Sequence, residues 1–372
     1  MLRKINIVLK GTLHLFKLWK FFKKEKIIYI FSSRFGHFLQ NTEILLRDLN
    51  RKDIKKTLFV LDEKIDNYEL LDIWKKYNLD FCSYEFGTLL RLLKRKKKII
   101  NHYQTVPKNK KKYLKNRIIK NLIPENKLSV PNEYLSITFR DSKYNKINYN
   151  TYNDEFRDTK KKDIRLLINF FKKKKIHLIK VNKTFNSKIN GIRDYGFNSN
   201  FKLENSLSLI KNSKIHIGSS TGIDTFAALI DKPMINVNTL LGNNFISRLY
   251  TFPTFILPIN LKYYSDKKIV PLSEQIKFLK YAENKYQINH LDNKLQKEFD
   301  VYYETNSYTE IISCFNEYLN FIKKKFYLDE KIKYYQKKFW SIYPKTYRHK
   351  ITKTVITSSR FFGNVFIPSS YF

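Results

Sequence analysis

A short run of small polar residues, Gly218-Ser219-Ser220-Thr221-Gly222, has the composition of an anion-binding turn. It follows the strand-like run 215–217 and precedes the apolar run 223–230, which predicts a buried strand, a turn and a helix. Backbone N–H groups in such a turn face an anion together with the positive end of the helix dipole, and hydroxyls add donors. This chemistry suits a diphosphate, although a tight connection capped by a serine or threonine explains the run equally well.

Two arginines are further candidates for binding phosphate. Arg140 follows the apolar run 134–139, and in an open α/β sheet ligands bind beyond the carboxyl ends of the strands. Its planar guanidinium matches phosphate oxygens, while a surface ion pair with Asp141 or Asp158 is the alternative. Arg157 is the second candidate, and a salt bridge at the start of a helix would explain it as well.

A histidine follows the first strand-like run of the chain. The pair Gly36-His37 lies after residues 27–31 and before a helical pattern over 38–49. The pKa of a histidine is ordinarily about 6.5, so that His37 can accept a proton from a hydroxyl group. We expect His37 to be a catalytic base, with capping or packing at the helix start as the alternative. Glu43 in the same helix is the next candidate.

The carboxylate, histidine and cysteine residues do not follow the spacing of a metal site. The sequence contains no Asp-x-Asp, and Cys82 and Cys314 are too far apart for a zinc motif or a disulfide framework. His177 and His216 each stand third in a Lys-Ile-His run at the start of a strand, which favours a place in the core. We therefore expect neither a metal nor another cofactor.

The elements that must position these residues alternate between strand and helix. Such alternation predicts parallel α/β sheets, and the proline-containing segment 123–131 divides two series of this kind. The expected parts are an amphipathic N-terminal helix, an acceptor-side Rossmann-like domain, a donor-binding Rossmann-like domain and a mostly helical C-terminal region. They cover residues 1–24, 25–126, 127–272 and 273–372.

Residues 1–24 have the pattern of an amphipathic helix. Apolar side chains recur at spacings of three and four at Ile5, Leu9, Leu13, Phe16 and Trp19. Lysines lie on the other side, so this helix suits the headgroup region of an anionic membrane. A helix packed on the first domain through the same apolar stripe is the alternative.

The chain carries a formal net charge of +39 over 372 residues. Its composition is typical of an AT-rich coding sequence, and many lysines fall on expected solvated helix faces. We attribute the charge to this bias and to membrane proximity, and expect no nucleic-acid partner. No apolar run is long enough to span a bilayer, and we expect no secretory signal. These observations predict a cytoplasmic protein that is peripheral on the inner face of the membrane.

The chain resembles GT-B glycosyltransferases, in which a Gly/Ser/Thr turn precedes a small-residue helix that ends before a proline and a strand. More specifically, it resembles a family of bacterial glycosyltransferases from surface-carbohydrate gene clusters. Two positions differ, because Lys180 and Asn182 stand where arginine and glycine are expected. The resemblance is carried by Arg34-Phe35-Gly36-His37, Ser136-Ile137-Thr138-Phe139-Arg140-Asp141 with Tyr144, Phe156-Arg157-Asp158-Thr159, residues 177–181, the serine turn through Asn238, residues 270–274 and residues 367–372.

The resemblance implies an α/β fold of GT-B type, with two Rossmann-type parallel-sheet domains facing a cleft. It implies metal-independent transfer of a sugar from a nucleotide-sugar donor to a glycan acceptor, which is often lipid-linked. The diphosphate would meet Arg140, Lys180 and residues 218–222. The nucleotide or sugar would meet Arg157 and the loop Arg193-Asp194-Tyr195, for which a plain turn is the alternative.

Two other functions remain open. Polyol-phosphate transferases and nucleotide-sugar 2-epimerases carry a similar Ser/Gly turn, but the helix after Gly222 lacks the paired glutamates of the epimerases. A nucleic-acid-binding protein would explain the charge and the aromatic residues interleaved with lysines over 333–340. That segment also fits an amphipathic helix, and the sequence contains no recognisable RNA- or DNA-binding motif.

Overall fold

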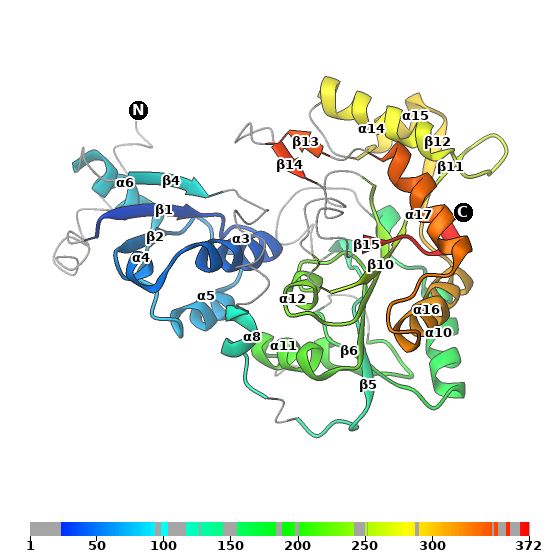
Figure 1. Ribbon diagram of the computed structural model, residues 1–372, viewed down its shortest axis with the longest axis horizontal. Coiled ribbons are helices and arrows are strands. Elements are labelled where there is room, and N and C mark those ends of the chain that lie inside the picture. The colour runs from blue at the N-terminus through cyan, green and yellow to red at the C-terminus, as the bar shows by residue number, and fades with distance from the viewer. Residues whose placement is uncertain are drawn as a thin grey trace. The chain divides into compact units, whose positions relative to one another are not determined.

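The chain forms two compact units, Met1–Pro124 and Glu125–Phe372, and each is described by itself (Figure 1). The predicted N-terminal helix, apart from Lys24, and Tyr144 lie outside the residues described. The computed structural model describes residues 24–93, 98–102, 117–125, 128–143, 155–183, 188–197, 201–241, 250, 252–286, 290–343, 346–348, 355–357 and 365–371.

Unit 1 is built on a four-stranded parallel sheet in the order β3-β2-β1-β4. Its register pairs Ile27 of β1 with Leu58 of β2 on one side and with Ile99 of β4 on the other. The strands are β1 (Lys26–Ile30), β2 (Thr57–Val60), β3 (Phe81–Cys82) and β4 (Lys98–His102). The helices are α3 (Phe35–Asp48), α4 (Arg51–Lys55), α5 (Tyr68–Lys75), α6 (Tyr84–Leu93) and α8 (Ile118–Leu122).

The core of unit 1 forms where apolar strands meet the apolar sides of the helices. All four residues of β2 are buried, as expected for a strand covered on both faces. Helix α5 begins at Asn67, whose side chain accepts a hydrogen bond from the Leu70 N–H at 2.7 Å. The strands pack against α6 through the buried residues Ile27, Leu58, Val60, Cys82, Phe86, Leu89 and Leu90.

Unit 2 contains a seven-stranded parallel sheet in the order β15-β10-β9-β8-β5-β6-β7. The chain starts at β5 in the middle, adds β6 and β7 on one side, and then crosses to add β8, β9 and β10 on the other. This is a Rossmann-like strand order, and its direction reverses between β5 and β8. The strands are β5 (Tyr134–Ile137), β6 (His177–Lys180), β7 (Arg193–Asp194), β8 (Ile215–Gly218), β9 (Met234–Thr239), β10 (Thr254–Pro258) and β15 (Val365–Phe366).

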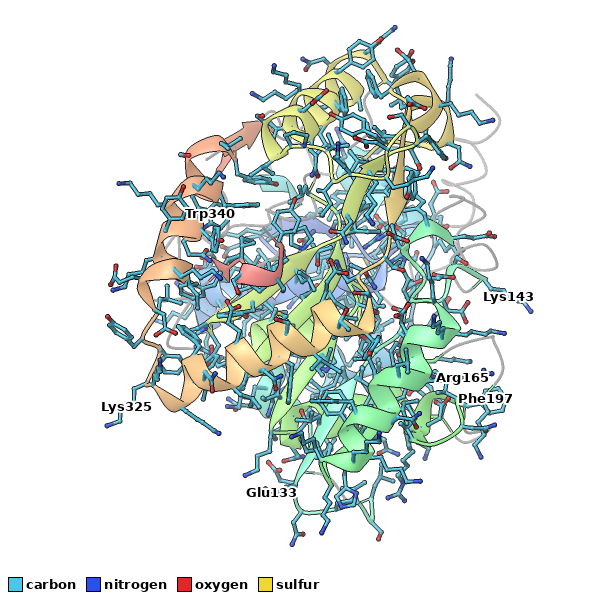
Figure 2. All side chains as sticks on the ribbon, turned by 90° about the vertical axis from the view of Figure 1, so that its right-hand side faces the viewer. Glu133, Lys143, Arg165, Phe197, Lys325 and Trp340 are labelled. Carbon is cyan, nitrogen blue, oxygen red and sulfur yellow. The ribbon has the colours of Figure 1, made fainter. Side chains whose placement is uncertain are left out.

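Helices cover both faces of this sheet. Helices α10 (Lys161–Lys173) and α16 (Tyr308–Lys323) pack against each other on one face, and α11 (Leu203–Asn212) and α12 (Asp224–Leu229) lie on the other (Figure 1). Figure 2 shows α16 crossing the sheet beside α10. Helix α16 begins with a capping box, in which Ser307 and Glu310 each bond the other's backbone N–H.

The C-terminal region, expected to be mostly helical, also supplies strands to unit 2. Strand β12 (Val301–Glu304) pairs antiparallel with β11 (Asn260–Tyr263), and β15 joins the large sheet beside β10. The segment after β15 is held by Gln336, which exchanges hydrogen bonds with the backbone of Ile367. The remaining elements are α14 (Leu272–Tyr286), α15 (Asn293–Glu298), α17 (Glu330–Ile342), β13 (Thr346–Arg348), β14 (Val355–Thr357) and three short 3-10 helices, Glu155–Arg157, Tyr195–Phe197 and Ser369–Tyr371.

The sheets and helices confirm the α/β class expected from the sequence, with a large and a small parallel sheet that are compatible with a Rossmann-like fold. Within the described ranges, no helix combines the length and the apolar character that crossing a membrane requires.

Candidate functional site

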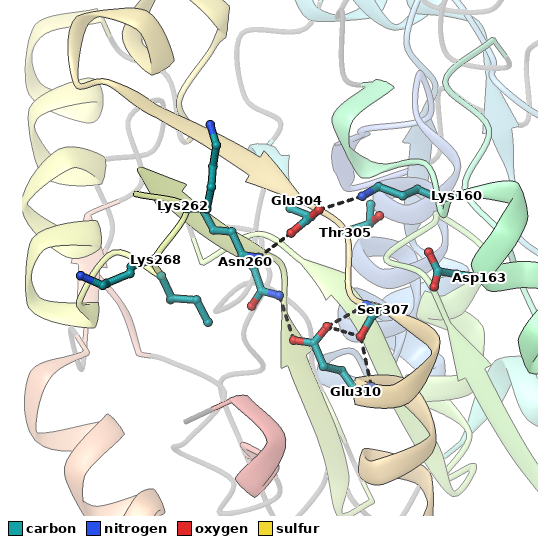
Figure 3. Close-up of a pocket in the computed structure, with 11 residues that line it drawn as sticks. Lys160, Asp163, Asn260, Lys262, Lys268, Glu304, Thr305, Ser307 and Glu310 are labelled. Atoms are coloured by element: carbon teal, nitrogen blue, oxygen red, sulfur yellow. Dashed lines mark hydrogen bonds and ion pairs between the residues drawn. The ribbon is translucent and has the colours of Figure 1, made fainter. Parts of the chain in front are cut away.

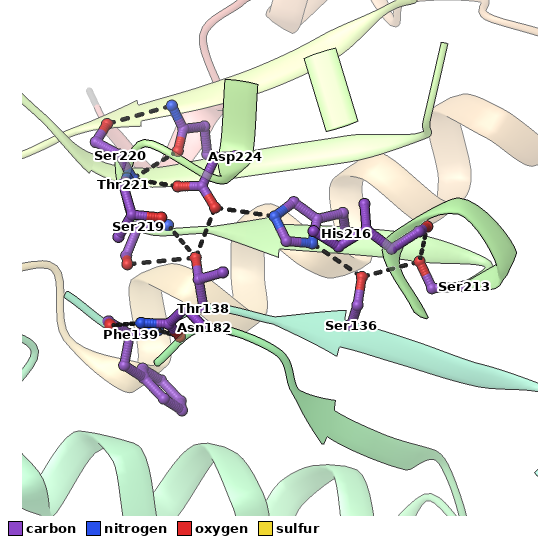
Figure 4. Close-up of polar contacts among 12 residues, drawn as sticks. Ser136, Thr138, Phe139, Asn182, Ser213, His216, Ser219, Ser220, Thr221 and Asp224 are labelled. Atoms are coloured by element: carbon purple, nitrogen blue, oxygen red, sulfur yellow. Dashed lines mark hydrogen bonds and ion pairs between the residues drawn. The ribbon is translucent and has the colours of Figure 1, made fainter. Parts of the chain in front are cut away.

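The loops after β5 and β8 meet at the carboxyl ends of these two strands, where the strand order of unit 2 reverses. Ligands of doubly wound sheets bind at this point. The Ser219 N–H donates to the Thr138 hydroxyl at 3.1 Å (Figure 4). The guanidinium of Arg140 lies 3.5 Å from the carbonyl oxygen of Ser220. The predicted candidates Arg140 and residues 218–222 therefore come together.

The backbone N–H groups of the turn are engaged by protein side chains. Ser219 donates to Thr138 as described, Ser220 donates to the Asn236 carboxamide at 2.9 Å, and Thr221 donates to the Asp224 carboxylate at 2.6 Å. Ser220 has a left-handed backbone (φ 58°), which turns the chain sharply. We expected these three N–H groups to face an anion; in the structure they shape the turn instead.

Gly218 is required by packing. A Cβ atom at this position would lie 2.8 Å from Cγ of Asp224 and 2.8 Å from Cε of Met234. Both distances are far below ordinary van der Waals contact, so only glycine lets Asp224 approach the end of β8. From the sequence we expect Gly218 to contact the ligand. In the structure its absent side chain makes room for Asp224 and Met234.

Exposure narrows the set of residues that a ligand can reach. Ser219 is 1% exposed and Ser220 is 8% exposed, and the Ser220 hydroxyl lies 2.9 Å from the Thr239 hydroxyl. Arg140, Thr221 and Gly222 are each half-buried and open to solvent. A phosphate group at the ends of β5 and β8 would therefore meet these three residues first.

A chain of buried polar side chains lies behind the turn (Figure 4). Asp224 accepts from the Thr138 hydroxyl at 2.7 Å and lies 3.0 Å from Nε2 of His216, whose Nδ1 lies 2.8 Å from the Ser136 hydroxyl. Ser136 in turn donates to Ser213 at 2.9 Å. The Ser–His–Asp order is that of a hydrolase triad, but Ser136, His216 and Asp224 have no exposed surface. Because no substrate can reach Ser136, this series of hydrogen bonds serves to hold Asp224 and the turn in place.

Lys180 is buried in an ion pair with Asp194. The ammonium lies 2.7 Å from the Asp194 carboxylate and donates to the carbonyl oxygen of Asn182 at 3.0 Å. Burial lowers the pKa of Lys180, and Asp194 acts in the opposite direction by stabilising the charged form. Both side chains are fully buried, so the pair joins β6 to β7 and does not face a ligand. This is a different role from the predicted contacts with donor phosphate and nucleotide.

The other three predicted contacts lie in separate parts of unit 2. Arg157 is buried near Tyr303. Burial raises the pKa of Tyr303 to about 12, while the positive charge of Arg157 acts to lower it. Arg193 is exposed in β7 and donates to the carbonyl oxygen of Ser129. The Tyr195 hydroxyl accepts a hydrogen bond from Asn205 at 2.8 Å. β7 is separated from β8 by β5 and β6, so Arg193 is not brought to the end of β8.

In unit 1, His37 lies in the first turn of α3, which follows β1 after a short loop. Its side chain is exposed, and the ring meets Phe31 edge to face with centroids 4.9 Å apart. β1 is also the strand at which the order of this sheet reverses. His37 therefore stands at the position where a ligand of such a sheet binds, within the helix and not in the loop expected before it.

Glu43 has a structural role. Its two carboxylate oxygens accept hydrogen bonds from the N–H groups of Ile118 and Ile119 at 2.9 Å, and Arg47 forms an ion pair with it. Both charged side chains are fully buried, and burial raises the pKa of Glu43 against the opposing effect of Arg47. Glu43 therefore ties α3 to the start of α8, which does not fit the role of an alternative base.

Three residues that organise the site were not singled out from the sequence. Thr138, Asn236 and Asp224 hold the turn at three consecutive N–H groups. A signal existed for Asp224, because an acidic residue in the first turn of a helix often caps preceding N–H groups. Thr138 and Asn236 gave no comparable signal, since their partners are 81 and 16 residues away in the chain.

Among the residues that the structure describes, no group of three or more His, Cys, Asp or Glu side chains is placed to hold a metal ion. Comparison of the chain with protein-family models, curated proteins and solved structures finds no match.

Proposed function

We propose that this protein is a glycosyltransferase of GT-B type that transfers a sugar from a nucleotide-sugar donor to a glycan acceptor. The observation that carries the proposal is the approach of the Arg140 guanidinium to the carbonyl oxygen of Ser220, in the turn at the carboxyl ends of β5 and β8. Thr221 and Gly222 of the same turn are half-buried. A diphosphate suits this place because a guanidinium binds phosphate oxygens with two parallel donors. The resemblance of the sequence to surface-carbohydrate glycosyltransferases adds the reaction class.

In the proposed reaction, the acceptor hydroxyl oxygen attacks the anomeric carbon of the donor sugar. The bond between that carbon and the diphosphate oxygen breaks, and its electrons leave with the nucleoside diphosphate. Arg140 stabilises the growing negative charge on the leaving group without a metal ion. His37 takes the proton that the acceptor hydroxyl loses.

Arg140→Ala tests the proposal through nucleotide binding. We expect at least tenfold weaker affinity for a nucleoside diphosphate, because a charged contact to phosphate is lost. The fold should stay intact, because Arg140 is half-buried in a loop. Titration calorimetry with UDP, GDP and ADP measures the effect. Arg165→Ala is the matched control, since Arg165 is exposed on α10 (Figure 2). Equal affinity of Arg140→Ala and the wild type, or no binding of any of the three nucleotides to the wild type, would contradict the proposal.

A further inference from the structure

Unit 2 contains a polar pocket away from the loops that follow β5 and β8. It is a pocket of about 520 Å³ between the β11–β12 pair and the N-terminal ends of α10 and α16 (Figure 3). No residue of the loops 138–141 or 219–224 lines it. Its volume falls in the range of small-molecule sites and suits one sugar unit. The residues that matter are Lys160, Asn260, Lys262, Glu304, Thr305 and Glu310.

Two buried side-chain oxygens in the wall of this pocket have no hydrogen-bond partner among the described residues. Asn260 is 4% exposed and Thr305 is 5% exposed. The amide nitrogen of Asn260 donates to Glu310 at 2.9 Å, but within the described part of the chain its carboxamide oxygen has no partner, and neither has the Thr305 hydroxyl. Buried polar atoms are nearly always hydrogen-bonded. A ligand that carries hydroxyl groups would supply the missing donor and acceptor.

Positive charge gathers at the same pocket. The ammonium groups of Lys160 and Lys262 both pair with Glu304, at 2.8 and 2.6 Å, so that two cations share one carboxylate. The two lysines lower the pKa of Glu304, which keeps it ionised. Lys267 and Lys268 line the pocket as well. The ligand that matches this arrangement bears a negative group.

The other two carboxylates of the pocket are already committed to helix capping. Asp163 accepts the Tyr308 N–H at 3.0 Å, and Glu310 accepts both the N–H and the hydroxyl of Ser307 at 2.7 Å. These bonds fix the first turn of α16 and hold its wall of the pocket in one position. A preformed wall reduces the entropy lost on binding.

We propose that this pocket binds an acidic sugar, meaning a pyranose that carries a carboxylate or a phosphate. The sugar hydroxyls bond to the Asn260 oxygen and the Thr305 hydroxyl, and the acidic group meets Lys160 and Lys262. The binding does not depend on the transfer reaction proposed above, because it uses none of the residues at the ends of β5 and β8.

Equilibrium binding to the full chain, followed by saturation-transfer NMR titration, tests the ligand class. The probes are glucuronic acid and glucose 6-phosphate, which carry a carboxylate and a phosphate at the same end of the ring. Glucose, which lacks the acidic group, and inorganic phosphate, which lacks the sugar, are the controls. We expect one or both acidic sugars to bind at least tenfold more tightly than glucose or phosphate. The stronger of the two identifies the acid. Phosphate that binds as tightly as glucose 6-phosphate, or glucose as tightly as both acidic sugars, would overturn the proposal.

Thr305→Val separates ligand binding from folding. The substitution keeps the shape and removes a hydroxyl that has no partner in the described part of the chain, so the unfolding midpoint should be unchanged or higher. Binding of the acidic sugar should weaken at least tenfold. A lower midpoint combined with wild-type affinity would show that the hydroxyl serves the fold, and would count against the proposal.

Lys262→Gln tests the charge, with Lys277→Gln on the exposed side of α14 as a control of equal charge change. We expect at least tenfold weaker binding in the first variant and none of this loss in the second. Arg140→Ala should bind the acidic sugar like the wild type, which distinguishes this pocket from the nucleotide site. Equal losses in both lysine variants, or loss of binding in Arg140→Ala, would refute the assignment.

Discussion

His37 is an exposed histidine in the first turn of α3, near the end of the sheet where a ligand of unit 1 would bind. Helix α3 follows β1, and the exposed ring of His37 packs edge to face against Phe31. An imidazole ordinarily exchanges a proton near neutral pH. Glu43, the other candidate in α3, is buried and engaged by Arg47 and α8. His37 is therefore the candidate base that we expect to matter for turnover.

We expect His37→Ala to lower kcat of sugar transfer by about 100-fold and to leave nucleoside diphosphate affinity almost unchanged, since the base acts on the acceptor hydroxyl. Steady-state kinetics and calorimetry measure the two quantities. His177→Ala provides the control, because His177 is an exposed histidine at the start of β6 in unit 2. Near wild-type turnover in His37→Ala would move the catalytic base to another residue.

At the scale of elements, the connection from β8 to α12 depends on one carboxylate. Asp224 receives hydrogen bonds from Thr138, His216 and Thr221, and it is fully buried. Its partners come from β8, from the loop after β5 and from the turn itself. The position of the half-buried residues Thr221 and Gly222 therefore depends on a fully buried side chain.

Asp224→Asn should destabilise unit 2 and weaken nucleotide binding together. The carboxamide puts an N–H₂ group where an acceptor is needed, so at least one buried donor loses its partner at a cost of about 1–3 kcal/mol. Urea unfolding followed by circular dichroism measures the loss. Asp72→Asn, on the exposed side of α5, should change stability by less than about 0.5 kcal/mol. If the Asp224→Asn protein were as stable as the wild type, the buried hydrogen bonds of Asp224 would not be needed for the fold.

Local sequence patterns anticipated many of the elements. The helix expected over 38–49 is α3 (Phe35–Asp48), and the strand expected over 215–217 is β8 (Ile215–Gly218). β10 and β11 were not anticipated, because Pro253 and Pro258 interrupt the run and proline weakens a strand pattern. β15 has two residues, and its pairing with β10 spans more than 100 residues of sequence. Periodicity reports local structure, whereas such a pairing depends on the whole fold.

The candidate site was anticipated in the same uneven way. The sequence located the turn and Arg140, because strand ends and small polar residues are visible locally. It assigned the N–H groups of the turn to a ligand, since nothing near residue 219 reveals that Thr138 and Asn236 engage them. It assigned Lys180 to phosphate, since the partner Asp194 becomes adjacent only when β6 and β7 pair.

At the scale of the whole molecule, the net charge of +39 is the dominant physical property. Such a charge attracts anionic surfaces through long-range electrostatics, and added salt screens the attraction. The lysines and the apolar stripe of residues 1–24 are the part of the sequence best suited to a lipid headgroup region. We propose that this segment holds the protein on the inner face of the cytoplasmic membrane.

Removal of residues 1–22 tests this proposal. The full chain should sediment with anionic vesicles and should be released by added salt, because each lysine near the surface contributes about 1 kcal/mol that salt screens. The truncated chain should remain largely in the supernatant while circular dichroism shows it folded. Equal sedimentation of both proteins would place the contact elsewhere, and an unfolded truncated protein would favour packing of the segment on unit 1.

The two outermost strands of the large sheet have a consequence for self-association. β7 and β15 have two residues each, the first being Arg193-Asp194 and the second being followed within two positions by Pro368. Long, unpaired apolar edges recruit strands from other molecules and start aggregation, whereas short edges, charges and prolines prevent it. Without β15, the buried run Phe255-Ile256-Leu257 of β10 would become such an edge. The segment around Val365 thus keeps a highly apolar sheet from extending into a neighbouring copy of the chain.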